Sequence, residues 1–162
     1  MPYTVTTDYT GRQIDLQAFR GSQRPTGQFK IELSLTKDGS SQQVAGIQKL
    51  VQRYVNILLT RAGDVHFDQN NGSSFFVDIR IGGVYTGEQL LHSFVFANAG
   101  TIAQLQAEDA NPDYGTAQPD EMIADARLLS SLFDNATGLL NLRIWLRSRT
   151  GDSVTFIVPV GA

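Results

Sequence analysis

Hydrophobic positions recur at steps of three and four between residues 44 and 59, as they do on one face of an amphipathic helix. The apolar side chains concerned are Val44, Ile47, Leu50, Val51, Tyr54, Val55, Leu58 and Leu59. Gly63 follows them and is a suitable C-terminal stop. The pattern therefore predicts a helix that ends shortly before Gly63.

The C-terminal stretch "LLNLRIWLRSRTGDSVTFIVPV" instead alternates with a period of two on both sides of a short "RTGD" turn. This alternation predicts a β-hairpin over residues 139–160. Because an isolated hairpin is marginally stable in water, it must lie on further strands, from this chain or from another one. Pro159 cannot donate a ladder hydrogen bond, so we expect the second hairpin strand to lie at a sheet edge.

Shorter patterns predict the remaining elements. Alternation in "FKIELSLT" predicts a strand from Phe29, and "FFVDIRIGG" is typical of a strand closed by paired glycines. Thr86 and Gln89 form a candidate capping box before a second helix, which Gly100 would bend or break. Pro119 is placed to start a third helix. The buried stripe of that helix would consist of Met122, Ile123, Ala126, Leu129 and Phe133.

These elements define the predicted fold class. It is a small single α+β domain, with about three helices packed on a short antiparallel or mixed sheet and a C-terminal β-hairpin. A chain of 162 residues is long enough for one compact core. Residues 1–28 are rich in Thr, Gly, Gln and Arg, which predicts an extended N-terminal arm that orders against a neighbour. The domain proper would then comprise residues 29–162.

Composition excludes several classes of function. The chain has no cysteine, which excludes disulfides, thiolate metal sites and a cysteine nucleophile. Its formal net charge of −3, with scattered Lys and Arg, does not favour nucleic acid as a partner. No apolar run approaches the roughly 18 residues of a spanning helix, and the N-terminus lacks the pattern of a signal peptide. We therefore expect neither membrane insertion nor secretion by that route.

The stretch "RAGDVHFDQNNGSSFF" resembles a metal-binding loop, because Asp64, His66, Asp68 and Asn70 alternate along it. A calcium loop requires glycine at its sixth position, which is absent here, and a carboxylate at its twelfth, where this chain has Phe75. A transition-metal site would need more than one imidazole. We therefore predict no metal and no cofactor, and expect a structural corner between a helix and a strand.

Familiar catalytic motifs are missing from the sequence, including the P-loop and the nucleophile elbow. A glycosidase needs only two suitably spaced carboxylates, so this chemistry stays open as an alternative. The carboxylates to test would be Glu32, Glu88, Asp109 and Glu121. Surface charge or helix capping explains all four more simply, and we predict no catalytic residue.

Trp145 stands between Arg143 and Arg147 on the polar face of the predicted hairpin. This arrangement fits a cation–π contact or an interface anchor. Packing in the core against a helix explains it equally well, because Trp fills cores as well as interfaces.

The segment "VAGIQKLVQRYVNILLTRAGDVHFDQNNGSSF" resembles the phage contractile-tail baseplate wedge proteins, a lysozyme-like family also called sheath initiators. In that family an amphipathic helix ends in Leu-Leu-Thr, a glycine follows, and Gly-Ser or Gly-Thr lies further on. A helix preceded by acidic residues and a terminal hairpin ending in a Val-Pro-type strand complete the likeness. The resemblance covers residues 29–81 and 119–160.

The resemblance implies a cofactor-free structural protein of the virion, located in the tail baseplate after assembly in the host cytoplasm. Its partners would be the tail sheath protein and other baseplate wedge proteins, with tail tube or hub proteins as further candidates. Its C-terminal strands would pair with strands of the first sheath ring by β-augmentation. The sheath-strand interface would comprise Leu140, Leu142, Ile144, Trp145, Val154, Phe156, Val158 and Val160. The wedge contacts would be Thr60, Gly63, Gly72 and Ser73, with the glycines also giving the corner backbone freedom.

Two features depart from the family pattern. Many members have Glu-Pro-Arg between the last helix and the hairpin, where this chain has "FDNATG", so the wedge contact of that motif cannot be carried over. Residues 85–109 also form a longer segment than the family needs. The alternatives to a sheath initiator are a lysozyme-like glycosidase of the tail and another tail connector or terminator protein.

Overall fold

The computed structural model describes residues 10, 12, 15–16, 19–23, 29–33, 43–66, 68–80, 86–134, 136 and 138–161. The helices are α1 (Ile47–Leu59), α2 (Phe75–Arg80) and α3 (Gly87–Ala110), followed by the 3-10 turn η1 (Pro112–Tyr114). The strands are β1 (Asp15–Leu16), β2 (Phe19–Gln23), β3 (Phe29–Leu33), β4 (Gln43–Val44), β5 (Ile123–Asp134), β6 (Leu139–Ser148) and β7 (Ser153–Gly161). The predicted α+β fold class, with three helices, a mixed sheet and a C-terminal hairpin, is confirmed.

The main sheet has five strands in the order β2-β3-β7-β6-β5, and β1 pairs separately with β4. Neighbouring strands are antiparallel except β3 and β7, which run parallel. The predicted hairpin of β6 and β7 therefore lies inside the sheet. Among the described strands, the open edges belong to β2 and β5.

The expected edge position of the strand that contains Pro159 is wrong, because β3 flanks β7 on the side away from β6. The described β3–β7 pairs are Phe29–Phe156 and Lys30–Ile157. Pro159 lies beyond them, so its missing N–H interrupts none of these pairs. An internal strand can therefore accommodate this proline.

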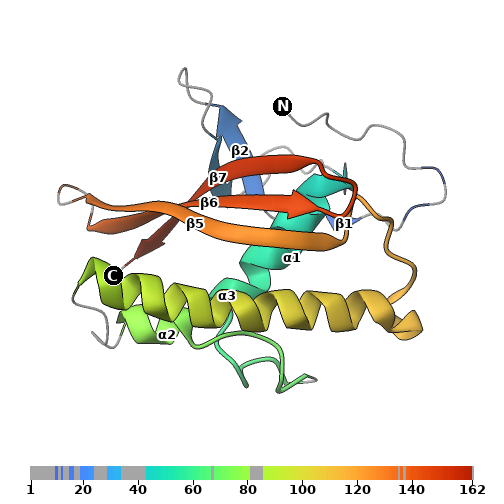
Figure 1. Cartoon of the computed structure of the whole chain (residues 1–162), viewed down its shortest axis with the longest axis horizontal. Helices are drawn as coiled ribbons and strands as arrows, with labels where there is room; N and C mark the ends of the chain where they lie inside the picture. Colours follow the sequence, from blue (N-terminus) through green and yellow to red (C-terminus); the bar gives the residue numbers. More distant parts are fainter. Residues whose placement is uncertain are drawn as a thin grey trace.

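The helices cover one face of the sheet, with α1 behind it and α3 running along β5 (Figure 1). Alternate side chains of β6 and β7 point toward these helices and are buried. The largest fully buried side chains are Tyr54, Phe75, Phe94, Phe156, Leu50, Leu58, Leu105, Ile123, Leu142, Ile144, Leu146 and Glu121. Burial of each large apolar side chain contributes about 1.5–3 kcal/mol to stability. Four of these side chains belong to β6 and β7, so the hairpin is a central part of the core.

Two predictions about helices are confirmed. α1 ends at Leu59, as its apolar stripe indicates. α3 begins with a complete capping box, in which Gln89 N donates to Thr86 Oγ1 at 3.2 Å and Thr86 N donates to Gln89 Oε1 at 3.1 Å. The break expected at Gly100 is wrong, because α3 continues through this residue.

The strand expected in "FFVDIRIGG" is wrong, because Phe75–Arg80 forms the short helix α2. The Phe75 ring is fully buried and meets the ring of Phe94 edge-on, with centroids 5.6 Å apart. Asp78 Oδ2 accepts a hydrogen bond of 2.7 Å from the Ser93 hydroxyl of α3. These contacts with α3 favour a helix in a segment whose alternation also fits a strand.

The third helix expected at residues 119–133 is also wrong, because this segment forms the edge strand β5. The pairing of β5 with β6 shifts register between Ile123 and Asp125 and again between Leu128 and Ser130. Each shift adds a residue to β5, so the positions facing the helices are separated by steps of three and two and do not show the regular alternation of a strand. The β5 residues opposite the inward side of β6 are Ile123, Ala126, Leu128, Ser131 and Phe133.

The predicted domain boundary at residue 28 falls inside a strand pair. β2 and β3 are antiparallel from the Phe19–Leu33 pair to the Gln23–Phe29 pair. The two described strands of the predicted arm, β1 and β2, therefore belong to the two sheets of the domain. Whether the arm orders against a neighbouring protein stays a prediction.

Candidate functional site

The loop between α1 and α2 is a closed structural corner. Ser73 N donates to Thr60 O at 2.8 Å, and the Ser73 hydroxyl donates to Leu58 O at 2.6 Å. Gly63 and Gly72 have φ values of +88° and +111°, which confirms that they supply backbone freedom. A Cβ on Gly72 would stand 2.6 Å from Thr60 O. The wedge-contact role of this corner stays a prediction, and the buried Ser73 holds the corner from inside.

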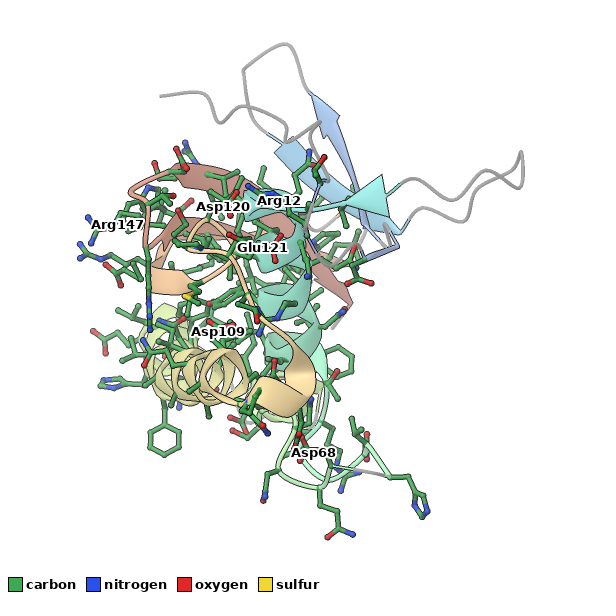
Figure 2. The ribbon with its side chains drawn as sticks, turned by 90° about the vertical axis from the view of Figure 1, so that its right-hand side faces the viewer. Arg12, Asp68, Asp109, Asp120, Glu121 and Arg147 are labelled. Atoms are coloured by element: carbon green, nitrogen blue, oxygen red, sulfur yellow. The ribbon has the colours of Figure 1, made fainter. Side chains whose placement is uncertain are left out.

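The alternating polar residues of this loop do not converge. Asp64 and His66 are exposed, whereas Asp68 Oδ1 accepts a hydrogen bond of 3.1 Å from Asn70 N in a local turn. Figure 2 shows Asp68 at the far end of the molecule from Glu121. Within the described residues, no group of three His, Asp or Glu side chains could hold a metal ion.

Glu121, one of the carboxylates singled out in the sequence, is held by groups from separate parts of the chain. Its side chain is only 1% exposed. Glu121 Oε2 accepts from Lys49 Nζ at 3.1 Å, and Oε1 accepts from Gly46 N at 3.1 Å. Arg12 Nη1 lies 3.6 Å from Oε1 and also binds both Asp120 oxygens, at 2.9 and 2.8 Å (Figure 2). The cluster fixes the N-terminal segment and the start of α1 to the chain just before β5.

Asp109 belongs to a second ionic cluster, between α1 and the end of α3. Arg53 donates to Asp109 Oδ1 at 2.8 Å and to Glu108 Oε2 at 3.0 Å. Burial lowers the pKa of Arg53, but its hydrogen bonds to the two carboxylates outweigh that effect and raise it. These partners are far apart in sequence, which is why the sequence did not indicate them.

The other two candidate carboxylates do not join these clusters. Glu88 is exposed in the first turn of α3, where it complements the helix dipole. Glu32 lies in β3, and its side chain is outside the described part of the structure. Among the described residues, the buried carboxylates Asp109 and Glu121 are both paired with cations and help to hold elements together.

The open edge of β5 carries an exposed apolar stretch that the sequence did not indicate. Leu129, Leu132 and Phe133 are 51%, 68% and 50% exposed. The stretch "LLSSLF" from Leu128 to Phe133 has no charge and no proline. Natural edge strands often carry charged residues or proline, which prevent pairing with another chain, and residues 128–133 lack both of these protections. The sequence signal for this stretch is the absence of charge from residues 128–133, which were expected to belong to a helix.

A second apolar stretch lies on the N-terminal half of α3. Leu91, Val95 and Phe96 are 49%, 57% and 81% exposed. No Asp, Glu, Lys or Arg occurs between Glu88 and Glu108. This half of α3 and the end of β5 lie at the same end of the molecule (Figure 1). We call the six exposed residues Leu91, Val95, Phe96, Leu129, Leu132 and Phe133 the apolar end.

The residues expected to contact a sheath strand lie in two different places. Six of them are core side chains under α1 and α3, namely Leu142, Ile144, Val154, Phe156, Val158 and Val160. Leu140 is partly buried against the same core. Trp145 points to the opposite face. The hairpin thus has its apolar side chains covered and both strands flanked, and the interface role assigned to it stays a prediction.

Trp145 is part of a basic patch on the outer face of the sheet. Arg143, Trp145 and Arg147 alternate with buried residues of β6, and Arg127 of β5 lies opposite Trp145. The guanidinium carbons of Arg127 and Arg147 lie 5.6 and 5.7 Å from the centroid of the Trp145 ring. The cation–π alternative is confirmed for Arg147, and the second cation over the ring is Arg127 of β5. We call Arg127, Arg143, Trp145 and Arg147 the outer arginine patch.

Comparison with protein-family models, curated proteins and solved structures finds no match for this chain. None of the helices in the described part of the chain is long and apolar enough to cross a membrane.

Proposed function

We propose that this chain is a non-enzymatic structural component of a phage contractile-tail baseplate, which nucleates the tail sheath by accepting a sheath strand. The sequence resemblance to sheath initiators supplies this setting. The observation that carries the mechanism is the open edge of β5, where residues 128–133 carry no charge and expose Leu129, Leu132 and Phe133.

The edge of β5 suits strand addition for two reasons. Its outer main-chain groups have no strand partner among the described residues, so an incoming extended segment can bind them by hydrogen bonds. Leu129 and Leu132 offer exposed apolar surface beside those groups, and side chains at alternate positions of the new strand set its register. The accepted strand would thus extend the sheet beyond β5 and leave the β6–β7 hairpin in place.

The exposed part of α3 supports an assembly role independently. A helix that is apolar around most of its circumference is normally covered on all sides. α3 packs on α1 and β5 with one side, while Phe96 remains 81% exposed on another. A neighbouring wedge protein would cover this side of α3 in the baseplate.

The proposal is tested by adding charges to the β5 edge. Purified baseplates that contain the Leu129→Lys, Leu132→Lys double variant are mixed with sheath subunits, and sheath length is measured by electron microscopy. Because lysines on an edge strand oppose pairing with another strand, we expect intact baseplates without sheath. The control is the Gln69→Lys, Gln106→Lys double variant, which adds the same charge at exposed positions away from the edge and should support normal sheaths.

Normal sheaths on the edge variant would contradict this function. So would cell-wall hydrolysis by the purified wild-type chain that Glu121→Gln abolishes while thermal stability is retained. That second result would establish the glycosidase alternative. Sheath growth that is normal in tails lacking the chain altogether would instead favour a connector or terminator role.

A further inference from the structure

The outer arginine patch is opposite in sign to the chain as a whole. The chain has a formal net charge of −3. In three consecutive rows across β5, β6 and β7, however, the outer face holds three arginines and one aspartate, Asp125. Figure 2 shows Arg147 directed away from α1, on the side of the sheet that the helices leave open. Such a local excess of positive charge indicates a negatively charged partner.

Two of the three arginines have no carboxylate partner among the described residues. Asp125 Oδ2 lies 2.7 Å from Arg127 Nη2 and accepts from its Nε at 2.9 Å. Arg143 and Arg147 have no comparable ion pair in the described part of the chain. Arg143 Nε is also buried without a hydrogen-bond partner there. The guanidinium groups of Arg143 and Arg147 are therefore suited to carboxylates of a partner.

From these observations we infer that the outer arginine patch binds an acidic, extended polypeptide segment of a partner protein. Arg143 and Arg147 lie four residues apart on the same face of β6. At the rise of a β-strand this corresponds to about 13 Å along the chain. An extended peptide has the same rise, so acidic residues four positions apart on one of its faces match the two guanidinium groups.

Single-stranded nucleic acid fits the same patch less well. Proteins that bind it stack successive bases on aromatic rings between basic side chains. Here Trp145 is the only tryptophan of the chain, and two guanidinium groups already lie over its ring. A base could stack on the Trp145 ring only by displacing one of these two guanidinium groups. The same groups would be needed to bind the phosphates of the nucleic acid.

The experiment uses Trp145 as its own reporter. Because the chain has one tryptophan, its emission reports on this patch alone. We titrate the full chain with a Glu-Thr repeat peptide and, as the matched probe, a Gln-Thr repeat peptide. The Glu-Thr peptide should change the emission saturably and bind at least about tenfold more tightly than the Gln-Thr peptide. Raising the salt concentration from about 0.05 to about 0.3 M should weaken that binding several-fold.

Variants then locate the binding site. Arg143→Gln combined with Arg147→Gln should weaken binding of the Glu-Thr peptide by about tenfold or more. Arg147→Gln alone, at an exposed position, should weaken it several-fold and serves as the second variant if the double variant has a lower Tm. Arg61→Gln is the matched control, because Arg61 is exposed on the corner loop and should leave the affinity unchanged.

Three results would overturn the inference. The first is equal binding of the two peptides, or no saturable change with either. The second is an equal loss of affinity in Arg61→Gln and in Arg147→Gln. The third is tighter binding of single-stranded oligothymidylate than of the Glu-Thr peptide, which would assign the patch to nucleic acid. None of these results depends on the proposed role of the β5 edge.

Discussion

At the residue scale, backbone geometry separates the two glycines of the corner loop. Gly63 and Gly72 both have positive φ, but only Gly72 also touches neighbouring backbone. An added Cβ there meets Thr60 O at 2.6 Å, whereas at Gly63 it meets nothing within 4 Å. The sequence predicted flexible glycines at this corner. It could not distinguish the two, because the close approach depends on residues that fold back from α1.

We predict that Gly72→Ala lowers the free energy of unfolding by about 2–4 kcal/mol, because it adds a steric clash to an unfavourable φ. Gly63→Ala carries the φ cost alone, and we expect a loss of about 1 kcal/mol. Urea denaturation of both variants measures the difference. Equal losses would show that the contact between Gly72 and Thr60 does not constrain the corner.

Tyr54 joins three elements through one hydrogen-bond chain. Its hydroxyl donates to Asn98 Oδ1 at 2.7 Å, and Asn98 Nδ2 donates to Ala126 O at 2.9 Å. Burial raises the pKa of Tyr54 well above its ordinary value of 10.0. The folded state therefore keeps this phenol neutral at a pH where the unfolded chain ionises it. Its contribution to stability is complete below about pH 10 and is lost as the pH rises further.

Tyr54→Phe should lower the free energy of unfolding by about 1 kcal/mol at neutral pH, because Asn98 Oδ1 loses its donor. Above about pH 10 the wild type should lose about 1.4 kcal/mol per pH unit from this group, whereas the variant has no phenol there to ionise. The difference between the two proteins should thus vanish near about pH 11. Urea denaturation at a series of pH values measures it, and a constant difference up to that pH would contradict the role of burial.

At the element scale, the success of each sequence prediction depended on whether its pattern was regular. α1 and the β6–β7 hairpin have unbroken periods of 3.6 and two, and both were predicted. β5 contains two register shifts, so its inward positions break the strand period of two, and its Ala and Leu residues also favour a helix. The sequence did not predict α2, because the helical conformation of this segment is favoured by its contacts with α3. Pairing and packing of this kind depend on distant parts of the chain.

The start of α3 is specified locally, and the capping box makes this testable. Thr86→Ala removes the acceptor of Gln89 N at the first turn. We predict a loss of about 1 kcal/mol in the free energy of unfolding. Thr116→Ala, at an exposed position of the loop after η1, is the matched control and should change stability by less than about 0.5 kcal/mol. Equal thermal melting of the two variants would mean that packing alone determines where α3 begins.

At the scale of the whole molecule, three surfaces differ in character. The helix-covered face of the sheet is closed, the outer face carries the outer arginine patch, and the apolar end combines β5 with α3. The sequence predicted the apolar side of the hairpin that the helices cover. It also predicted part of the cation–π arrangement around Trp145, namely the contact with Arg147. It could not predict the apolar end, because the six residues belong to two elements and the exposure of three of them depends on β5 being an edge strand.

The apolar end should govern how the isolated chain behaves in solution. Exposed apolar side chains and an unpaired strand edge both favour association with other chains, and the described part of this chain has both. Without its partners, the purified chain should therefore self-associate reversibly as its concentration rises. We predict that Phe96→Lys combined with Leu132→Lys keeps the chain monomeric at concentrations where the wild type associates, without lowering Tm, because both side chains are largely exposed. Analytical ultracentrifugation over a concentration series measures this, with the Gln69→Lys, Gln106→Lys double variant as the control for added charge. If that control suppresses association to the same extent, net charge and not the apolar end would be the cause, and the case for a docking edge on β5 would lose its support from solution behaviour.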